Sequence, residues 1–335
     1  MWSIVQWKHN TIAQIVTEPM TEEEKEWIVE KLCEECATTA SIATKLAQDT
    51  KQYTKELPIP DEYQQHWRVF SQEESHWFPP LRIWDHAIDL KEGAPPKIDC
   101  KLIPMTPAED ETLWTFLKEQ TDKGCIWESK SPYTSAFFFI KKKDGKLHPI
   151  QDYWKLNEQT IRNWYLLPLI PDLIAEVQNA WVFMKFDIRW GYNNVWIKEG
   201  DEHKAVFKTK YRLFEPRVMF FGLTNSPATF QAMTNKILRD LQEKYRPLGV
   251  VISGYMDDYL IATSSSLELH RQATHDLLDL IEQHDLFIKL EKCVWEAPRV
   301  DYLGLILEKG VVCMDPAKIA GVAEWPIPIT IKQVW

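Results

Sequence analysis

The sequence lacks several features that would place the protein in a membrane or outside the cell. Its 335 residues hold no apolar run near the ~18 residues that a membrane-spanning helix needs. The start, MWSIVQWKHN, lacks the basic segment and apolar core of a secretory signal peptide. The six cysteines are scattered, and Cys33-Glu-Glu-Cys36, which has zinc-knuckle spacing, has no second pair nearby. We therefore expect an intracellular protein with reduced thiols and no membrane partner.

Basic charge is also scarce, but only in one part of the chain. The net charge is -10, and residues 1–120 account for all of it, with 22 acidic and 12 basic residues. The remainder is neutral, with 27 residues of each sign. Within it, residues 130–162 carry seven basic residues against three acidic ones. This segment predicts a phosphate-binding surface, with a solvated hairpin as the alternative.

The first third of the chain has few signals of a compact fold. Residues 21–38 are predicted to form a helix, because Thr21 and Glu24 make a capping box at its start. A polar stretch and proline-marked segments follow. We interpret residues 1–57 as an acidic, partly helical linker and residues 58–335 as the folded domain.

Strand and helix signals alternate through the rest of the chain. Pro107 and Gly124 delimit one predicted helix, and Asp144-Gly145 is the turn of a predicted hairpin. Further strands are predicted at 181–188 and 251–263, a second hairpin at 204–216, and helices that begin near 226 and 267. This order predicts an α+β fold in which an antiparallel sheet carries helices on one face.

The stretch VISGYMDDYLIAT, residues 251–263, places two adjacent carboxylates between apolar runs. A plain hairpin turn is one interpretation, since aspartate is common in turns. Tyr255 and Met256 before the pair are untypical of turns, however, and no glycine follows it. Asp187 also ends an apolar strand, 70 residues before Asp257. Three converging carboxylates must share protons or bind cations, and two Mg²⁺ ions held in this way catalyse phosphoryl transfer.

Several motifs together extend this prediction. FDIRWGYNN, FGLTNSPATFQ, GYMDDYLIAT and DYLGLI, in this order, closely resemble the reverse transcriptases of gypsy-type LTR retrotransposons, especially the fungal ones. The resemblance covers residues 58–335. It implies a right-hand polymerase fold with a truncated thumb. The fingers would be about 100–157 and 197–220, the palm about 158–196 and 221–313, and the start of the thumb 314–335.

The resemblance also implies the residues of a catalytic site. Asp187 and Asp257 would bind two Mg²⁺ ions, with Mn²⁺ as an alternative, and the Ile188 carbonyl would assist. Asp258 would be a third, more peripheral ligand. Lys292 matches the position of a proton donor to pyrophosphate, with a plain surface lysine as the alternative.

The remaining implied roles concern the nucleotide and the primer–template. Tyr192 would be the aromatic gate that rejects a ribose 2′-OH, with a plain core tyrosine as the alternative. The other nucleotide-binding residues would be Lys142, His148, Phe221 and Gly222. The primer and template contacts would be Trp154, Tyr255, Met256, Leu303 and Gly304.

Some residues depart from the pattern of the family. His148 and Trp154 stand where relatives carry arginine, whose forked donors match phosphate better than imidazole or indole does. Each exchange can arise from one C→T or G→A transition. The alternative to an active polymerase is therefore a decayed, non-catalytic remnant that keeps the fold and at most binds nucleic acid. Tyr192 and the YMDD form argue against an RNA-dependent RNA polymerase or a nucleotide cyclase.

By the same resemblance, the chain is a piece of a Gag-Pol polyprotein that also carries protease, RNase H and integrase. Its partners would be a primed RNA or DNA template and deoxynucleoside triphosphates. Its location would be a cytoplasmic virus-like particle or the nucleus.

Overall fold

The computed structural model describes residues 5–8, 11–15, 59–76, 84–141, 145 and 147–314. The chain divides into two compact units, one of residues 1–55 and 314–335 and the other of residues 56–313. In the first unit, β1 (Val5–Lys8) pairs antiparallel with β2 (Thr11–Ile15). The predicted helix at 21–38 and the predicted start of the thumb lie outside the described residues, apart from Met314. Among the described helices, none has the length and apolar character needed to cross a membrane.

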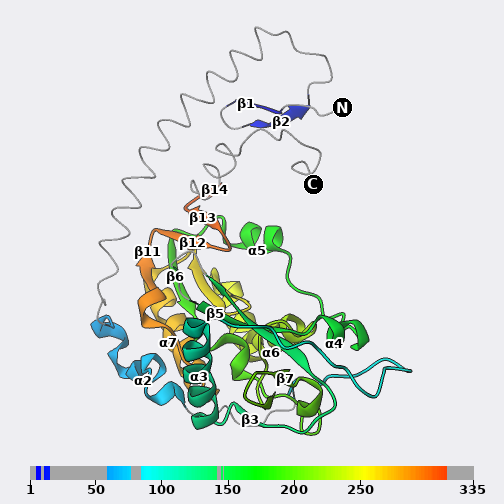
Figure 1. Cartoon of the computed structure of the whole chain (residues 1–335). Helices are drawn as coiled ribbons and strands as arrows, with labels where there is room; N and C mark the ends of the chain where they lie inside the picture. The colour runs from blue at the N-terminus through cyan, green and yellow to red at the C-terminus, as the bar shows by residue number, and fades with distance from the viewer. Residues whose placement is uncertain are drawn as a thin grey trace. The chain divides into compact units, whose positions relative to one another are not determined.

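The second unit contains a four-stranded antiparallel sheet, here called the central sheet, two of whose strands are labelled β6 and β11 in Figure 1. Its order is β11-β6-β10-β9. The strands are β6 (Val182–Asp187), β9 (Val250–Tyr255), β10 (Asp258–Thr263) and β11 (Val294–Ala297). β6 and β10 are almost wholly buried, as expected for apolar runs in the middle of a sheet. The predicted strands on both sides of Asp257 are confirmed.

Two long helices cover one face of the central sheet. They are α6 (Ser226–Tyr245) and α7 (Leu267–Gln283). Phe230, Met233 and Ile237 have the spacing of one helical face and form a buried apolar stripe on α6. Asn225 occupies the N-cap of α6, but its side chain bonds to the segment 161–163 and does not cap the helix.

The opposite face of the central sheet packs against a shorter helix and a hairpin. The helix is α5 (Ile170–Val177), and the hairpin consists of β12 (Arg299–Tyr302) and β13 (Leu305–Glu308). The third strand beside this hairpin is β14 (Val311–Met314). The predicted arrangement of helices on one face thus holds for the long helices α6 and α7, while α5 lies on the other face.

A five-stranded sheet of order β3-β8-β7-β4-β5 makes the second layer of strands. Its strands are β3 (Ile126–Glu128), β4 (Ser135–Lys141), β5 (Leu147–Asp152), β7 (Phe207–Lys208) and β8 (Leu213–Pro216). Both predicted hairpins, β4–β5 and β7–β8, are confirmed. The parallel pairing of β4 with β7 joins them, which the purely antiparallel prediction did not include.

The helix α3 (Pro107–Asp122) packs beside this sheet through Leu113 and Leu117. Its predicted start is confirmed, and Thr106 with Glu109 forms a complete capping box. The remaining helical elements are short. They are η1 (Asp61–His66), α2 (Trp67–Phe70), η2 (Glu74–His76), α4 (Trp154–Gln159), η3 (Gly191–Asn194), η4 (Glu202–Lys204), η5 (Arg246–Leu248) and η6 (Leu290–Lys292).

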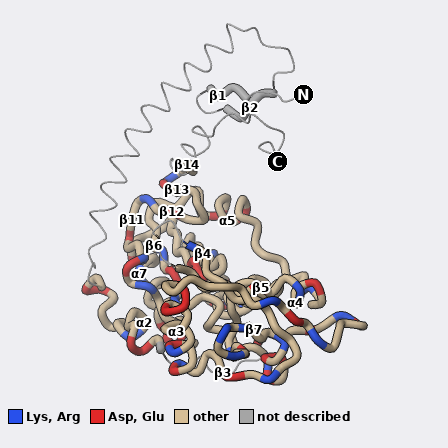
Figure 2. The backbone as a smooth tube through the Cα atoms, viewed as in Figure 1, with Lys and Arg blue, Asp and Glu red and all other residues tan. Residues whose placement is uncertain are grey.

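Acidic and basic residues are interspersed along the described backbone (Figure 2). In the segment 130–162, Lys155 lies on α4 and Arg162 follows that helix, while Lys142, Lys143 and Lys146 lie outside the described residues. The predicted phosphate-binding surface is therefore described only in part.

Gly254 lets helix α6 approach strand β9 closely. A Cβ atom at this position would lie 2.5 Å from Thr234 Cγ2 and 2.7 Å from Leu238 Cδ1, both on α6. Real side chains do not tolerate such distances, and interiors have little space into which neighbours can shift. The glycine thus sets the separation of α6 from the sheet.

We predict that Gly254→Ala lowers the free energy of unfolding by about 1–3 kcal/mol, because the added methyl group overpacks this contact. Urea denaturation measures the change. Thr234→Ser removes the nearest methyl group, so in that background the cost of Gly254→Ala should fall. Equal costs in both backgrounds would contradict the role assigned to this contact.

Candidate functional site

The carboxylates of the predicted site meet at one end of the central sheet. Asp187 ends β6, Asp258 begins β10, and the two are direct partners in the antiparallel register. Directly opposed residues place their side chains on the same face of a sheet. The Ile188 amide donates to the Asp257 carbonyl at 2.7 Å, which joins the end of β6 to the β9–β10 turn. The pairing of β6 with β10 thus brings all three aspartates to one end of the central sheet, here called the carboxylate edge.

The turn between β9 and β10 consists of Met256 and Asp257, since Tyr255 pairs with Asp258. Met256 has φ 53°, a left-handed conformation that costs a non-glycine residue about 1–2 kcal/mol. Gln231 of α6 holds this conformation. Its side chain, which is fully buried, accepts from the Met256 amide at 2.8 Å and donates to the Gly254 carbonyl at 2.7 Å.

Three lysines surround the carboxylates. Lys289 and Lys292 each donate to one oxygen of Asp187, the latter at 2.7 Å. Lys185 forms an ion pair with Asp258 at 3.3 Å. The predicted residue Lys292 is therefore beside Asp187, and Lys185 and Lys289 join it.

These neighbours shift the acidities in opposite directions. Burial alone would raise the pKa of Asp187, which is only 6% exposed, but the hydrogen bonds from Lys289 and Lys292 outweigh burial and lower that pKa. Burial raises the pKa of Asp257, and the charges of Asp187 and Asp258 raise it further. The site thus holds Asp187, whose charge is balanced by two lysines, beside Asp257, which is buried and faces like charge.

A row of aromatic rings leads away from Asp257. The Tyr192 ring lies 5.0 Å from that of Phe221, and the Phe221 ring lies 6.1 Å from that of His148, centroid to centroid. Gly191, the residue before Tyr192, lies beside Asp257, since a Cβ atom at this position would be 4.0 Å from Asp257 Oδ2. Burial raises the pKa of Tyr192, and the charge of Asp257 raises it further. Phe221 is half exposed. Three predicted nucleotide-binding residues are thereby contiguous, while Lys142 lies outside the described residues.

Gly222 follows Phe221 where the chain passes close to β5. Its φ is +103°, and a Cβ atom would lie 3.1 Å from the Gln151 carbonyl oxygen, so glycine is required by both conformation and space. Asn157 of α4 donates to the Gly222 carbonyl at 2.8 Å. Trp154 begins the same short helix and is 70% exposed, with its indole nitrogen donating to Glu158 at 2.8 Å.

Leu303 and Gly304 form a two-residue turn between β12 and β13. Both have positive φ, 52° and 75°, as type I′ hairpin turns require. Leu303 packs in the same apolar cluster as Tyr255, on the face of the central sheet opposite α6. These two predicted primer contacts therefore share one cluster, and His148 and Trp154 belong to the five-stranded sheet and α4.

The fold places this site within a known architecture. The structure resembles the foamy viral protease-reverse transcriptase in complex with an RNA/DNA hybrid, with a TM-score of 0.69 and 16% identity over 86% of this chain and 39% of that one. A related foamy viral structure with double-stranded DNA gives a TM-score of 0.69 and 15% identity, covering 86% and 50% of the two chains. The chain thus has the mixed α/β right-hand fold of these polymerases.

Sequence comparison identifies the family. Residues 140–307, half of the chain, match the family model described as reverse transcriptase (RNA-dependent DNA polymerase). This chain belongs to the reverse transcriptase family. It is 29% identical over 283 residues to the Transposon Tf2-3 and Tf2-7 polyproteins of Schizosaccharomyces pombe, a match that covers 84% of this chain. The chain spans about one fifth (20%) of the length of these relatives.

Membership of this family implies divalent metal ions. Mg²⁺ takes oxygen ligands, often one or two carboxylates together with substrate phosphates. Asp187, Asp257 and Asp258 carry such oxygens at one end of the central sheet, where burial, and then the charges of Asp187 and Asp258, raise the pKa of Asp257. Among the described residues, no group of three or more His, Cys, Asp and Glu side chains is placed so that it could hold a metal ion by itself. Carboxylates of this kind can share an ion with the phosphates of a bound nucleotide.

The sequence interpretation missed three residues of this site. Lys185 lies two positions before Asp187 on the same strand, and the period of two places both side chains on one face. Gln231 is a polar residue within the buried stripe of α6, which is itself a signal. Lys289 carries no local signal, because tertiary contacts such as the bridge between Ile188 and Ile288 bring it to Asp187.

We predict that Gln231→Leu lowers the free energy of unfolding by about 1–3 kcal/mol, because two buried backbone groups lose their partner. Gln242→Leu is the matched control: Gln242 also lies on α6 and donates to a β9 carbonyl, that of Ile252, but in a partly exposed position. Water can replace that bond, so the control should lose less. Equal losses in urea denaturation would contradict the special role of Gln231.

Proposed function

We propose that this chain is the RNA-directed DNA polymerase module of a gypsy-type LTR retrotransposon of fungal type. It adds deoxynucleotides to a primer 3′-OH on an RNA or DNA template. The observation that carries the proposal is the register of β6 and β10, which sets Asp187 opposite Asp258 with Asp257 in the adjoining turn. The similarity to the Tf2 polyproteins and to foamy viral enzymes bound to nucleic acid supports it.

Asp187 and Asp257 would be the main ligands of two Mg²⁺ ions, or of Mn²⁺ as an alternative, with Asp258 and the Ile188 carbonyl assisting. Such ions, when bound, activate the attacking hydroxyl and neutralise charge on the transferred phosphoryl group. Lys292 would give its proton to the leaving pyrophosphate. Burial would lower the pKa of Lys292, but its bond to Asp187 outweighs burial and raises that pKa, so the side chain is charged near neutral pH.

The row Tyr192, Phe221 and His148 would receive the incoming nucleotide. Tyr192 packs against Phe230 of α6, with ring centroids 5.6 Å apart, so its ring has little freedom to move away from a sugar. Gly222 would let the nucleotide approach the backbone, and Lys142 would meet the triphosphate. Met256, Tyr255, Leu303, Gly304 and Trp154 would contact primer and template.

The two sheets support the assignment of subdomains. We assign the fingers to about 100–157 and 197–220, which contain the five-stranded sheet, and the palm to about 158–196 and 221–313, which contain the central sheet. Residues 1–57 would be a linker and 314–335 the start of a thumb. As part of a Gag-Pol polyprotein, the module would work inside the cell, in a virus-like particle or the nucleus.

A non-catalytic remnant is the second candidate, and the exposed indole of Trp154 favours it. A polymerase of this kind is expected to meet the template phosphates here with a cation, and Trp154 instead bonds to the carboxylate of Glu158. Such a remnant would bind a primed template without extending it.

We predict primer extension on an RNA template with Mg²⁺ and deoxynucleotides, and a loss of about three orders of magnitude in Asp257→Asn, because several kcal/mol of metal-dependent stabilisation disappear. Asp240→Asn, an exposed change on α6, is the matched control and should retain the rate. Binding without extension by the wild-type chain would favour the remnant.

We further predict that Tyr192→Ala raises the relative use of ribonucleotides by about 10- to 100-fold, because the ring no longer excludes the 2′-OH. Tyr192→Phe keeps the ring and should keep the discrimination. Competition between deoxynucleotides and ribonucleotides in primer extension measures the ratio. An unchanged ratio in Tyr192→Ala would leave Tyr192 as a plain core residue.

A further inference from the structure

Residues 59–76 form a segment, here called the strap. It packs against helix α7 and strand β11, both of which lie far from it in the sequence. Tyr63, Val69 and Phe70 are buried in the apolar cluster between α6, α7 and the central sheet. Phe70 lies beside Phe186, the residue before Asp187, with ring centroids 6.5 Å apart. The strap is thus part of the core beside the strand that ends at Asp187.

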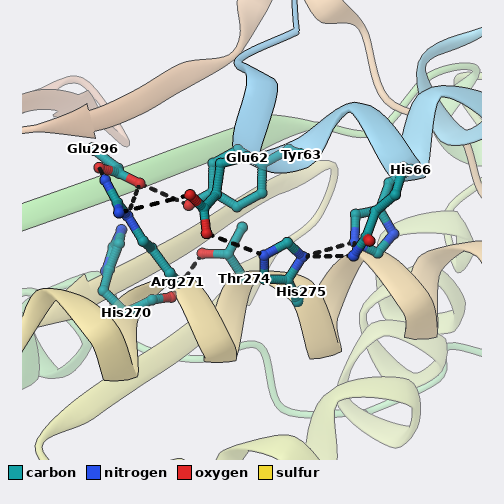
Figure 3. A network of polar contacts seen from close by, with 9 residues as sticks. Glu62, Tyr63, His66, His270, Arg271, Thr274, His275 and Glu296 are labelled. Carbon is teal, nitrogen blue, oxygen red and sulfur yellow. Dashed lines mark hydrogen bonds and ion pairs between the residues drawn. The ribbon is translucent and has the colours of Figure 1, made fainter.

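A polar network fastens the strap to α7 and β11 (Figure 3). Arg271 of α7 donates to both oxygens of Glu296, at 2.8 and 2.9 Å. The hydroxyl of Tyr63 donates to Glu296 at 2.8 Å. This part of the network is a bidentate ion pair joined by the buried phenol of Tyr63. The bond between Arg271 and Glu296 raises the pKa of Arg271 and lowers that of Glu296. Both side chains therefore keep their charges over a wide pH range.

The second part of the network is a pair of histidines. His66 of the strap, which is 3% exposed, has its Nε2 2.9 Å from Nδ1 of His275 on α7. The outer nitrogen of His66 faces Asp279 at 3.3 Å, and that of His275 faces Glu62 at 3.7 Å. The side-chain nitrogen of Gln65 also lies 3.1 Å from this His66 nitrogen and 3.2 Å from this His275 nitrogen. The space between the two rings therefore has no room for a proton on each ring nitrogen.

The strap also contacts the segment that carries the lysines. The Ile288 amide donates to the Val69 carbonyl at 2.8 Å. The next amide, that of Lys289, donates to the Asp187 carbonyl at 2.9 Å, and the Lys289 ammonium bonds to the Asp187 carboxylate. A continuous line of hydrogen bonds therefore runs from the strap through residues 288 and 289 to Asp187.

We propose that the strap positions the lysine-bearing segment 287–292 against Asp187, and that the His66–His275 pair is the latch that holds the strap closed. Tyr63 and His66 are in this sense positioning residues, because neither touches the carboxylates. The proposal rests on the proposed function for the role of Asp187. Its test measures amide exchange, which requires no polymerase activity.

The latch depends on pH. Burial lowers the pKa of His66, and the charge of His275 lowers it further, while Asp279 and Glu282 oppose the shift. The other charged groups nearby are Glu62 and Arg68 on the strap and Arg271 on α7, and Arg68 pairs with Glu282 at 3.4 Å. Because the open strap restores the ordinary pKa near 6.5, protons favour opening as pH falls below that value. Above it, the closed strap carries no such penalty.

The experiment is hydrogen exchange, resolved by residue, at about pH 7.5 and about pH 5.5. We expect the protection factors of the Ile288 and Lys289 amides to fall in acid relative to those of β10. At about pH 5.5, one unit below the ordinary pKa of histidine, the fall should approach but not exceed about tenfold. The β10 amides report global unfolding, including the effect of the buried His270, which bonds to Thr263 at the end of β10.

Two variants and a control complete the test. The double change His66→Gln and His275→Gln removes both titratable groups, so the extra fall should vanish. Asp279→Asn alters a 58% exposed side chain and should enlarge the fall, because the carboxylate that favours a charged His66 is gone. It also serves if the double variant does not fold. His203→Gln, an exposed change on η4, should behave as the wild type.

The outcomes separate the two parts of the proposal. If Ile288 and Lys289 exchange in parallel with β10 at both pH values, the latch does not exist. If Ile288 loses protection in acid and Lys289 does not, the strap opens without moving the lysine segment, and the positioning role is wrong. A failure of primer extension with a normal exchange pattern would refute the polymerase proposal and leave the latch intact.

Discussion

The pairing of β6 with β10 is the constraint on which the rest of the structure depends. One register sets Asp187 opposite Asp258, and the bond from the Ile188 amide to the Asp257 carbonyl closes the edge. A slip of one residue would turn every side chain of β6 to the other face and separate the carboxylates. Because β6 and β10 lie in the middle of the sheet and are buried on both faces, such a slip would also disrupt two apolar clusters.

Several weaker interactions stabilise the carboxylate edge against charge repulsion and backbone strain. Three carboxylates repel one another, and Met256 has a left-handed backbone. Lys289 and Lys292 compensate the charge of Asp187, and Gln231 holds the turn from the buried side. Strain and repulsion concentrated in one place, and compensated from its surroundings, are typical of functional sites. The strap, which lies more than a hundred positions before Asp187 in the sequence, adds to this support.

Local patterns predicted much of this. The hairpins β4–β5 and β7–β8, helices α3, α6 and α7, and the strands around Asp257 all follow from apolar spacing, turn residues and caps. The parallel pairing of β4 with β7 was not predictable, since nothing in either strand specifies its neighbour. The role of Lys289 was not predictable for the same reason, because tertiary contacts alone bring it to Asp187. The site roles came from a family resemblance, and the spacing of the carboxylates explains why that chemistry needs them.

The central claim is that this carboxylate edge binds divalent ions together with a nucleotide, and Mn²⁺ binding followed by electron paramagnetic resonance tests it most directly. With a chain-terminated primer on an RNA template and the matching deoxynucleotide, the account predicts about two bound ions per chain, as a two-metal site requires. Asp187→Asn should lose this binding, while Asp240→Asn should keep it. Binding that is absent from the wild-type chain, or unchanged in Asp187→Asn, would contradict the account.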